Sequence, residues 1–304
     1  MARDVLPSVD RDASELLADR RVLAVLAVVV VVTGGAAGLF LYHPAPGTPS
    51  SAPFATDDPP VPVNGSYRVV GQTRATQRGE GTTYAERTRT YVPGEPAVAL
   101  GRWTFGGGAD RTTVSYYQRG TTEYVRQTWA NVSEYRSSRE HLSNQTRSEG
   151  DFFHAVNITR TIYRTETREK GVDAAPAGSI ALSALATLPY ERRGTTTYRG
   201  REVVRYVPRT GWVTRGTDGN TLSARVGAAS GEMLVDPATG AVLFADVEAT
   251  TTQADTWGRV LMEPAITLSV EYRVTPGVEN PGSPPWIREM RDAINATADT
   301  TRGQ

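Results

Sequence analysis

The sequence predicts an α+β fold, in which an N-terminal transmembrane helix precedes a curved, mostly antiparallel β-sheet (half-barrel) domain with two or three helices. Residues 22–42 form a run of 21 residues without a charge. One helix of that length spans a hydrocarbon core of about 30 Å. Most of residues 66–296 alternates between apolar and polar positions with period two and is rich in Thr, Tyr and Val, as in half-buried antiparallel strands.

The apolar run predicts a retained single-pass anchor, because the apolar region of a cleavable signal peptide is usually about 7 to 15 residues long. Cleavage is the alternative. Arg20 and Arg21 precede the run, whereas no Lys or Arg lies between His43 and Tyr67. Basic residues near a membrane helix stay in the cytoplasm. We therefore expect a cytoplasmic tail at residues 1–21 and an extracytoplasmic C-terminal domain at the cell membrane.

Two further features accompany the predicted anchor: a glycine motif within it and a proline-rich segment after it. Gly34 and Gly38 form a G-x-x-x-G motif, which lets two membrane helices approach and makes these glycines candidates for helix dimerisation. Residues 43–65 are predicted to be a stalk, because seven prolines among residues 44–63 favour polyproline II.

Glycosylation sequons support the outside location of the domain. Five of the seven asparagines lie in N-x-S/T sequences, where glycans are attached on exported surfaces. The alternative is that a Thr-rich chain has many polar loops. The candidate sites are Asn64, Asn131, Asn144, Asn157 and Asn295.

The domain itself is predicted as a series of strands. The last strand shows the clearest pattern, because Ile266, Leu268, Val270 and Tyr272 alternate with polar residues and must face a core. A turn at 236–240, with Asp first, Pro second and Gly last, joins two strands of a hairpin. The predicted strands cover 67–77, 83–92, 97–105, 111–118, 121–129, 196–208, 232–235, 241–251 and 266–273.

Two helices are predicted within the domain. Residues 179–188, SIALSALATL, contain helix formers and end before Pro189. A second helix begins after Ser283-Pro284-Pro285 and places apolar residues on one side, which should dock on the sheet. Its apolar residues are Trp286, Ile287, Met290 and Ile294. Residues 297–304 are expected to form a frayed C-terminus.

The order of these elements resembles the LolA/LppX-like superfamily of lipoprotein and lipid carriers. The resemblance rests on a helix leading to Tyr-x-Gly-Arg-Glu at 198–202, followed by Val-Asp-Pro-x-Thr-Gly at 235–240. It implies a curved sheet around helices with an apolar cavity for acyl chains. Candidate lining residues are Trp103, Phe105, Leu268 and Val270, for which ordinary core packing is the alternative. The chain lacks the lipobox cysteine, which argues against a freely diffusing carrier.

The composition weighs against catalysis, cofactors and nucleic acid. There is no cysteine, which excludes disulfides and thiolate metal sites. His43, His141 and His154 form no metal-spaced pair, and no serine lies in a G-x-S-x-G elbow. Lys plus Arg and Asp plus Glu number 33 each, so no general basic surface is expected. We expect neither an enzyme, nor a bound cofactor or metal, nor a nucleic-acid partner.

The sequence therefore predicts a membrane-anchored cell-surface domain that binds a lipid or another hydrophobic ligand. The alternative is a ligand-free surface adaptor or structural module that binds another protein.

Overall fold

The computed structural model describes residues 53–54, 59–77, 81–107, 110–130, 152–156, 161–168, 171–174, 180–217 and 220–292. The predicted tail, the predicted anchor with Gly34 and Gly38, and the predicted frayed terminus lie outside these residues. Within the described ranges, no helix has both the length and the apolar character needed to cross a bilayer.

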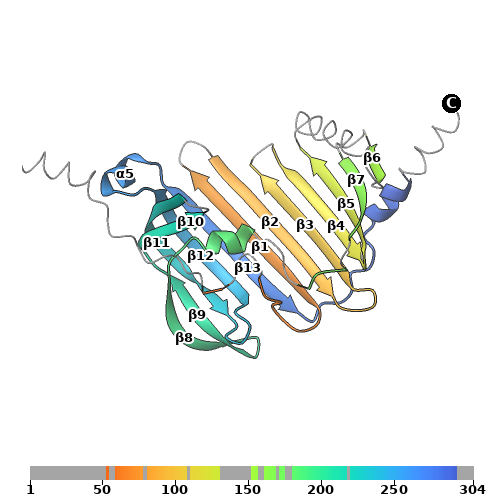
Figure 1. The fold of residues 1–304 in the computed structure, drawn as a ribbon, viewed down its shortest axis with the longest axis horizontal. Helices are drawn as coiled ribbons and strands as arrows, with labels where there is room; N and C mark the ends of the chain where they lie inside the picture. The colour runs from red at the N-terminus through yellow and green to blue at the C-terminus, as the bar shows by residue number, and fades with distance from the viewer. Residues whose placement is uncertain are drawn as a thin grey trace, which may run out of the picture.

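Thirteen strands of the described residues form one antiparallel sheet (Figure 1). Their spatial order is β6-β7-β5-β4-β3-β2-β1-β13-β12-β11-β9-β8, and β10 pairs with β11 beside this path. The strands are β1 (Tyr67–Gln77), β2 (Gly81–Val92), β3 (Val98–Gly106), β4 (Thr112–Arg119), β5 (Thr122–Trp129), β6 (Phe152–Val156), β7 (Thr161–Thr167), β8 (Tyr190–Tyr198), β9 (Arg201–Pro208), β10 (Gly211–Thr217), β11 (Asn220–Val235), β12 (Val242–Gln253) and β13 (Ile266–Pro276).

Three helices accompany the sheet in the described part of the chain. They are α4 (Ile180–Leu185), α5 (Trp257–Met262) and a C-terminal helix that begins at Trp286 and is described to residue 292. The predicted antiparallel sheet with two or three helices is confirmed at this level. The first five predicted strands agree with β1 to β5 within two residues at each end.

The sequence prediction was wrong at three places. The single strand predicted at 196–208 is the end of β8 and all of β9, joined by a turn in which Arg199 and Gly200 have φ of 51° and 78°. No strand was predicted between residues 208 and 232, where β10 and most of β11 lie; β10 pairs with the start of β11. Helix α5 was not predicted, because it is only six residues long and has no amphipathic repeat.

Strand β1 joins the two ends of the domain. All 11 of its residues pair with β2 on one side and with β13 on the other. Because directly opposed residues of antiparallel strands point to the same face, the register divides the sheet into two faces. We call the side of Val69, Thr73, Val270 and Tyr272 the inner face, and the opposite side the outer face.

The larger hydrophobic core lies on the inner face. Helix α4 packs on β1 and β13 (Figure 1) and buries Leu182 and Leu185. Beneath it, most inner-facing residues of β12 and β13 are small or branched, with Tyr272 as an aromatic exception, as expected where a helix must approach a sheet closely. They include Val247, Val270 and Val274.

Part of the predicted stalk belongs to this core. Phe54 and Val63, both inside the predicted segment 43–65, are buried in the same cluster as Leu185. The Arg201 Nη1 also donates a hydrogen bond of 3.5 Å to the carbonyl of Pro62. The domain therefore begins packing at Phe54, earlier than the composition of the segment predicts.

A second core lies on the outer face at the other end of the sheet. There the C-terminal helix buries Trp286, Ile287 and Met290 against Tyr117 and Tyr163. The prediction that this helix docks on the sheet is confirmed for these described residues. The two cores thus lie on opposite faces, displaced from each other along the sheet.

Replacing Leu185 with Ala should lower the free energy of unfolding by about 2 to 5 kcal/mol, because it leaves a cavity under α4. The matched control is Ile180→Ala on the same helix, where the side chain is 37 % exposed and a loss below about 1 kcal/mol is expected. Denaturant unfolding measures both, and equal losses would contradict the packing described for α4.

Replacing Gly231 with Ala should cost at least about 2 kcal/mol of folding free energy. Gly231 in β11 has φ of 99°, and a Cβ there would lie 1.9 Å from the backbone carbonyl oxygen of Asp246. At Gly227 in the same strand, the nearest atom to an added Cβ is the backbone carbonyl oxygen of Thr250 at 3.9 Å. Gly227→Ala should therefore change the free energy of unfolding by no more than about 0.5 kcal/mol. Thermal unfolding of the two variants side by side checks the difference.

Candidate functional site

The inner face of β2, β3 and β4 carries large side chains beyond the strands on which α4 packs. Register places Gly71, Arg87, Trp103 and Val114 in one row across four strands. The neighbouring row contains Thr73, Ala85, Phe105 and Thr112. These rows bring aromatic, aliphatic and cationic side chains together next to the main core.

Aromatic rings dominate this part of the inner face. The ring centroids of Trp103 and Phe105 are 4.8 Å apart and tilted by 43°, a geometry typical of favourable aromatic pairs. The next row on this face contains Val69, Arg89, Gly101 and Tyr116. A Cβ added at Gly101 would lie 2.2 Å from the ring of Tyr116. The absence of a side chain at Gly101 therefore lets the Tyr116 ring lie flat against β3.

Two polar atoms in the rows have unused hydrogen-bonding capacity. The indole Nε1 of Trp103 and the hydroxyl of Thr73 are buried, and neither has a hydrogen-bond partner among the described residues. Thr73 as a whole is only 7 % exposed. Because an unmet buried donor costs free energy, such atoms are often satisfied by a ligand or by water.

Carboxylates are scarce on the inner face of the described strands β1 to β5. Arg87 and Arg89 of β2 point to the inner face. The acidic residues of β2, β12 and β13 point to the outer face; they are Glu86, Asp246, Glu248 and Glu271. Among the described side chains of β1 to β5, the one inner-facing carboxylate is Glu123, which forms an ion pair with Arg168. The inner face near Trp103 is therefore biased towards positive charge.

The short segment 171–174 is fixed to the inner face at the border with α4. The Tyr67 hydroxyl donates a hydrogen bond to the carbonyl of Ala174, and Arg89 donates one to the carbonyl of Asp173. Burial raises the pKa of Tyr67 to about 12, although the nearby Arg89 guanidinium acts in the other direction. Tyr67 is thus a neutral hydrogen-bond donor at ordinary pH.

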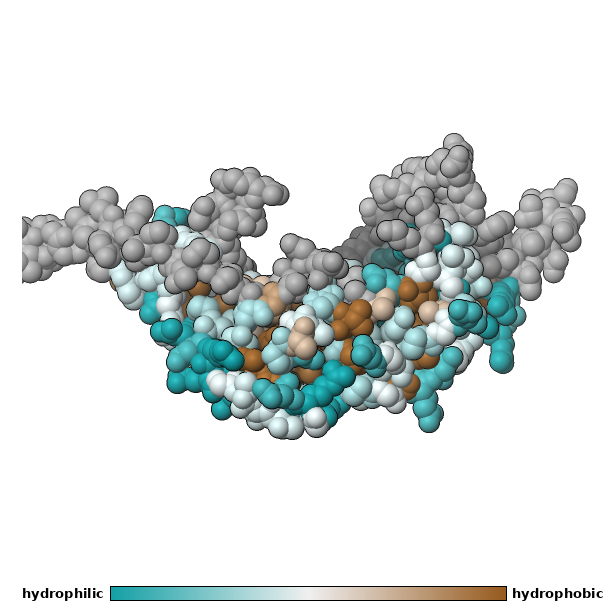
Figure 2. Space-filling model, turned by 60° about the horizontal axis from the view of Figure 1, so that its bottom comes forward, coloured by the Kyte–Doolittle hydropathy of each residue, from teal (hydrophilic) through white to brown (hydrophobic). Residues whose placement is uncertain are grey.

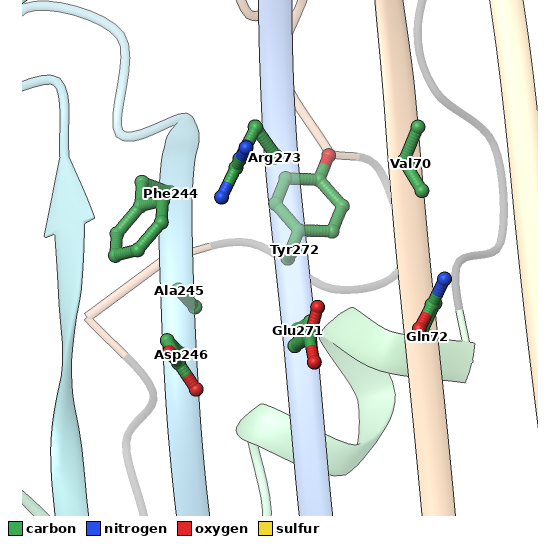
Figure 3. A pocket seen from close by; sticks show the side chains of 8 residues that line it. All are labelled: Val70, Gln72, Phe244, Ala245, Asp246, Glu271, Tyr272 and Arg273. Carbon is green, nitrogen blue, oxygen red and sulfur yellow. The ribbon is translucent and has the colours of Figure 1, made fainter.

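A shallow pocket of about 210 Å³ lies on the outer face, where side chains of three neighbouring strands meet (Figure 3). Its outer-facing residues are mostly polar or charged, and Arg273 lies over the Phe244 ring at 5.8 Å. In Figure 2 hydrophilic residues gather on the convex underside of the molecule, and hydrophobic residues lie in a band above it. At about 210 Å³ the pocket is smaller than the roughly 300 to 1,000 Å³ typical of small-molecule sites, and four of its outer-facing side chains are polar or charged. It is lined by Val70, Gln72, Phe244, Ala245, Asp246, Glu271, Tyr272 and Arg273.

All four predicted lining residues point to the inner face, but they divide into two groups. Val270 is fully buried in the main core and Leu268 packs against that core. Trp103 and Phe105 are partly buried two strands away from β1. Sequence reasoning missed Thr73, Arg87 and Arg89; their polar side chains at inward positions of β1 and β2 were the available signal.

The other predicted sites have little structural description. Asn64 is exposed, as a glycosylation site requires. Asn131, Asn144, Asn157 and Asn295 lie outside the described residues, as do His43 and His141, and only the backbone of His154 is described, in β6. The described residues contain no cluster of three or more potential metal ligands.

Comparison with known proteins finds only distant likeness. No protein-family model and no curated protein matches the chain. A provisionally named outer membrane lipoprotein-sorting protein domain from Vibrio parahaemolyticus is 8 % identical, with 71 % of this chain and 88 % of that chain covered and a TM-score of 0.18. A DUF1329 family protein from Desulfovibrio piger is 9 % identical, with 72 % and 89 % covered and a TM-score of 0.19. These scores support no argument about function.

The raised pKa of Tyr67 predicts a loss of stability at alkaline pH. Its unfolded pKa is 10.0 and its folded pKa about 12, so the neutral phenol stabilises the fold fully below pH 10 and this contribution disappears as pH rises to about 12. Tyr67→Phe should reduce the fall in unfolding free energy across this range by on the order of 2 kcal/mol. Burial also raises the pKa of Tyr190 and Tyr272, so the fall should be reduced and not abolished. Urea titrations at a series of pH values test this, and parallel curves for parent and variant would refute it.

Proposed function

We propose that this chain is a single-pass membrane protein whose extracytoplasmic domain binds a lipid or another hydrophobic ligand on its inner face, around Trp103. Residues 22–42 serve as the anchor, with the N-terminus in the cytoplasm, and the curved sheet acts as a half-barrel around the ligand. The domain is a binding module and not an enzyme.

The proposed ligand site is supported by a comparison of two surfaces of the sheet on which the described helices do not pack. One is the outer face of β12, β13 and β1, and the other is the inner face of β3 and β4. On the outer face, β12, β13 and β1 present Asp246, Glu271, Arg273 and Gln72, as a solvated surface does. On the inner face, β3 and β4 present Trp103, Phe105, Val114 and Tyr116. An aromatic surface at this position has the composition of a hydrophobic binding site.

The polar atoms of the site suggest the chemistry of the ligand. The Trp103 Nε1 is a donor only, and the Thr73 hydroxyl can donate or accept. Together with the inner-facing guanidinium of Arg87, they favour a ligand whose hydrocarbon part lies on the rings and whose polar part accepts hydrogen bonds. Fatty acids and lipid esters have this combination of groups.

Photolabelling of the full-length chain in membranes tests this proposal. A long-chain fatty acid that carries a diazirine should label peptides from β3 and β4 after illumination. Trp103→Ala should lower that labelling about tenfold, because it removes the largest apolar contact and the buried donor.

Phe244→Ala is the matched control, because Phe244 is an aromatic residue on the outer face. It should leave labelling of β3 and β4 unchanged. Labelling that avoids the inner face in the parent, or that persists in Trp103→Ala, would reject the ligand site and leave a ligand-free adaptor as the better description.

A further inference from the structure

Helix α5 presents apolar side chains to the outside of the domain. Leu261 and Met262 are each 75 % exposed and Trp257 is 38 % exposed. Five large hydrophobic residues are exposed in the described part of the chain, and these are three of them. In Figure 1 α5 projects from the end of β12, at the edge of the molecule.

The helix is held firmly at its base, so this exposure is not the result of a loose end. The Thr256 hydroxyl accepts a hydrogen bond of 3.3 Å from the backbone N–H of Arg259 and caps the helix. Thr256 and Gly258 are both buried. Helix α5 is therefore fixed at its N-terminal end, and its exposed side chains are directed away from the core.

Aromatic and cationic side chains surround Trp257 at the beginning of α5. The ring of Trp257 meets that of Trp212 edge-on at 5.5 Å, and the Arg225 guanidinium lies 5.2 Å from the Trp257 ring centroid. Arg259 forms ion pairs with Asp255 and Glu263. Tryptophan beside arginine, next to exposed aliphatic side chains, is the composition of proteins at the boundary between lipid headgroups and acyl chains.

The length of the chain before the domain puts a membrane within reach. If residues 22–42 are the anchor, 11 residues separate it from Phe54, which is already buried in the domain core. At about 3.1 Å per residue they span roughly 34 Å as polyproline II, which is shorter than the sheet, whose path of twelve strands extends over roughly 50 Å at about 4.8 Å per strand. Such a tether keeps one face of the domain close to the bilayer.

We propose that α5 docks on the bilayer surface, where Leu261 and Met262 enter the interface and Trp257 lies at the headgroup level. The occupant of this apolar surface is thus the membrane that anchors the chain. The inference rests on the anchor of the proposed function and is independent of the inner-face ligand. Docking at α5 would orient the sheet relative to the membrane.

The chain contains no cysteine, so a single introduced thiol can report on one position. Full-length chain with Leu261→Cys, labelled with the fluorophore NBD, is reconstituted into vesicles of phosphatidylcholine and phosphatidylglycerol with brominated acyl chains. We expect the fluorophore at position 261 to be quenched by bromine and its emission to shift to the blue. The matched control is Thr196→Cys on the exposed edge strand β8, where neither change is expected.

Adding Met262→Glu to the Leu261→Cys chain should lower the quenching at least about threefold, because it places a charge in the interface. Equal quenching at positions 261 and 196, or no effect of Met262→Glu, would overturn the proposal, including the case in which a protein partner covers α5. Flotation of the same samples tests the anchor separately. A chain that does not float with the vesicles refutes the anchor, whereas one that floats without quenching at position 261 refutes only the docking of α5.

Discussion

The pairing of β1 with β13 is the interaction on which the rest of the domain depends. This ladder connects the first strand of the domain to the last over 11 residues, and β2 completes the environment of β1 on its other side. Without it the β1–β7 part and the β8–β13 part would be two separate sheets. The ladder also aligns Val69 with Val274 and Thr73 with Val270, which gives the inner face a continuous row structure across both halves.

The position of the two cores follows from this long sheet. A sheet of this width cannot be covered on one face by α4 alone, because α4 is only six residues long. The C-terminal helix instead covers the distant end of the outer face, where it packs on Tyr117 and Tyr163. The α4 core therefore lies on the opposite face of β1, β12 and β13 from a charged surface. The C-terminal core likewise lies on the opposite face of β3 and β4 from the aromatic surface around Trp103.

Much of the fold could be predicted from the sequence because strict alternation has one structural solution. Ile266 to Tyr272 and the first five strands are examples. The turn at Arg199 could not be predicted, since a long side chain at a φ of 51° is rare and the surrounding residues have strong β propensity. Phe54 and Val63 are buried despite their proline-rich context, because long-range packing overrides local composition.

The candidate site could be predicted only in part, for a related reason. Trp103 and Phe105 were found by the phase of their strand, but phase alone does not separate a binding surface from a core, as Val270 shows. Arg87 and Arg89 alternate with polar residues on both sides, so a pattern search has no apolar neighbour from which to infer that they face inwards. Their inward orientation comes from pairing with Gly71 and Val69, which is visible only in the assembled sheet.

The β1–β13 ladder also has a consequence for how the domain is made. Among the described strands β1 is synthesised first, but its partner β13 is complete only at Pro276, some two hundred residues later. Until then one edge of β1 has no partner strand. Pairings at such sequence separation close slowly and expose aggregation-prone edges. A chain of this topology is therefore most exposed to aggregation before its last strand has been synthesised.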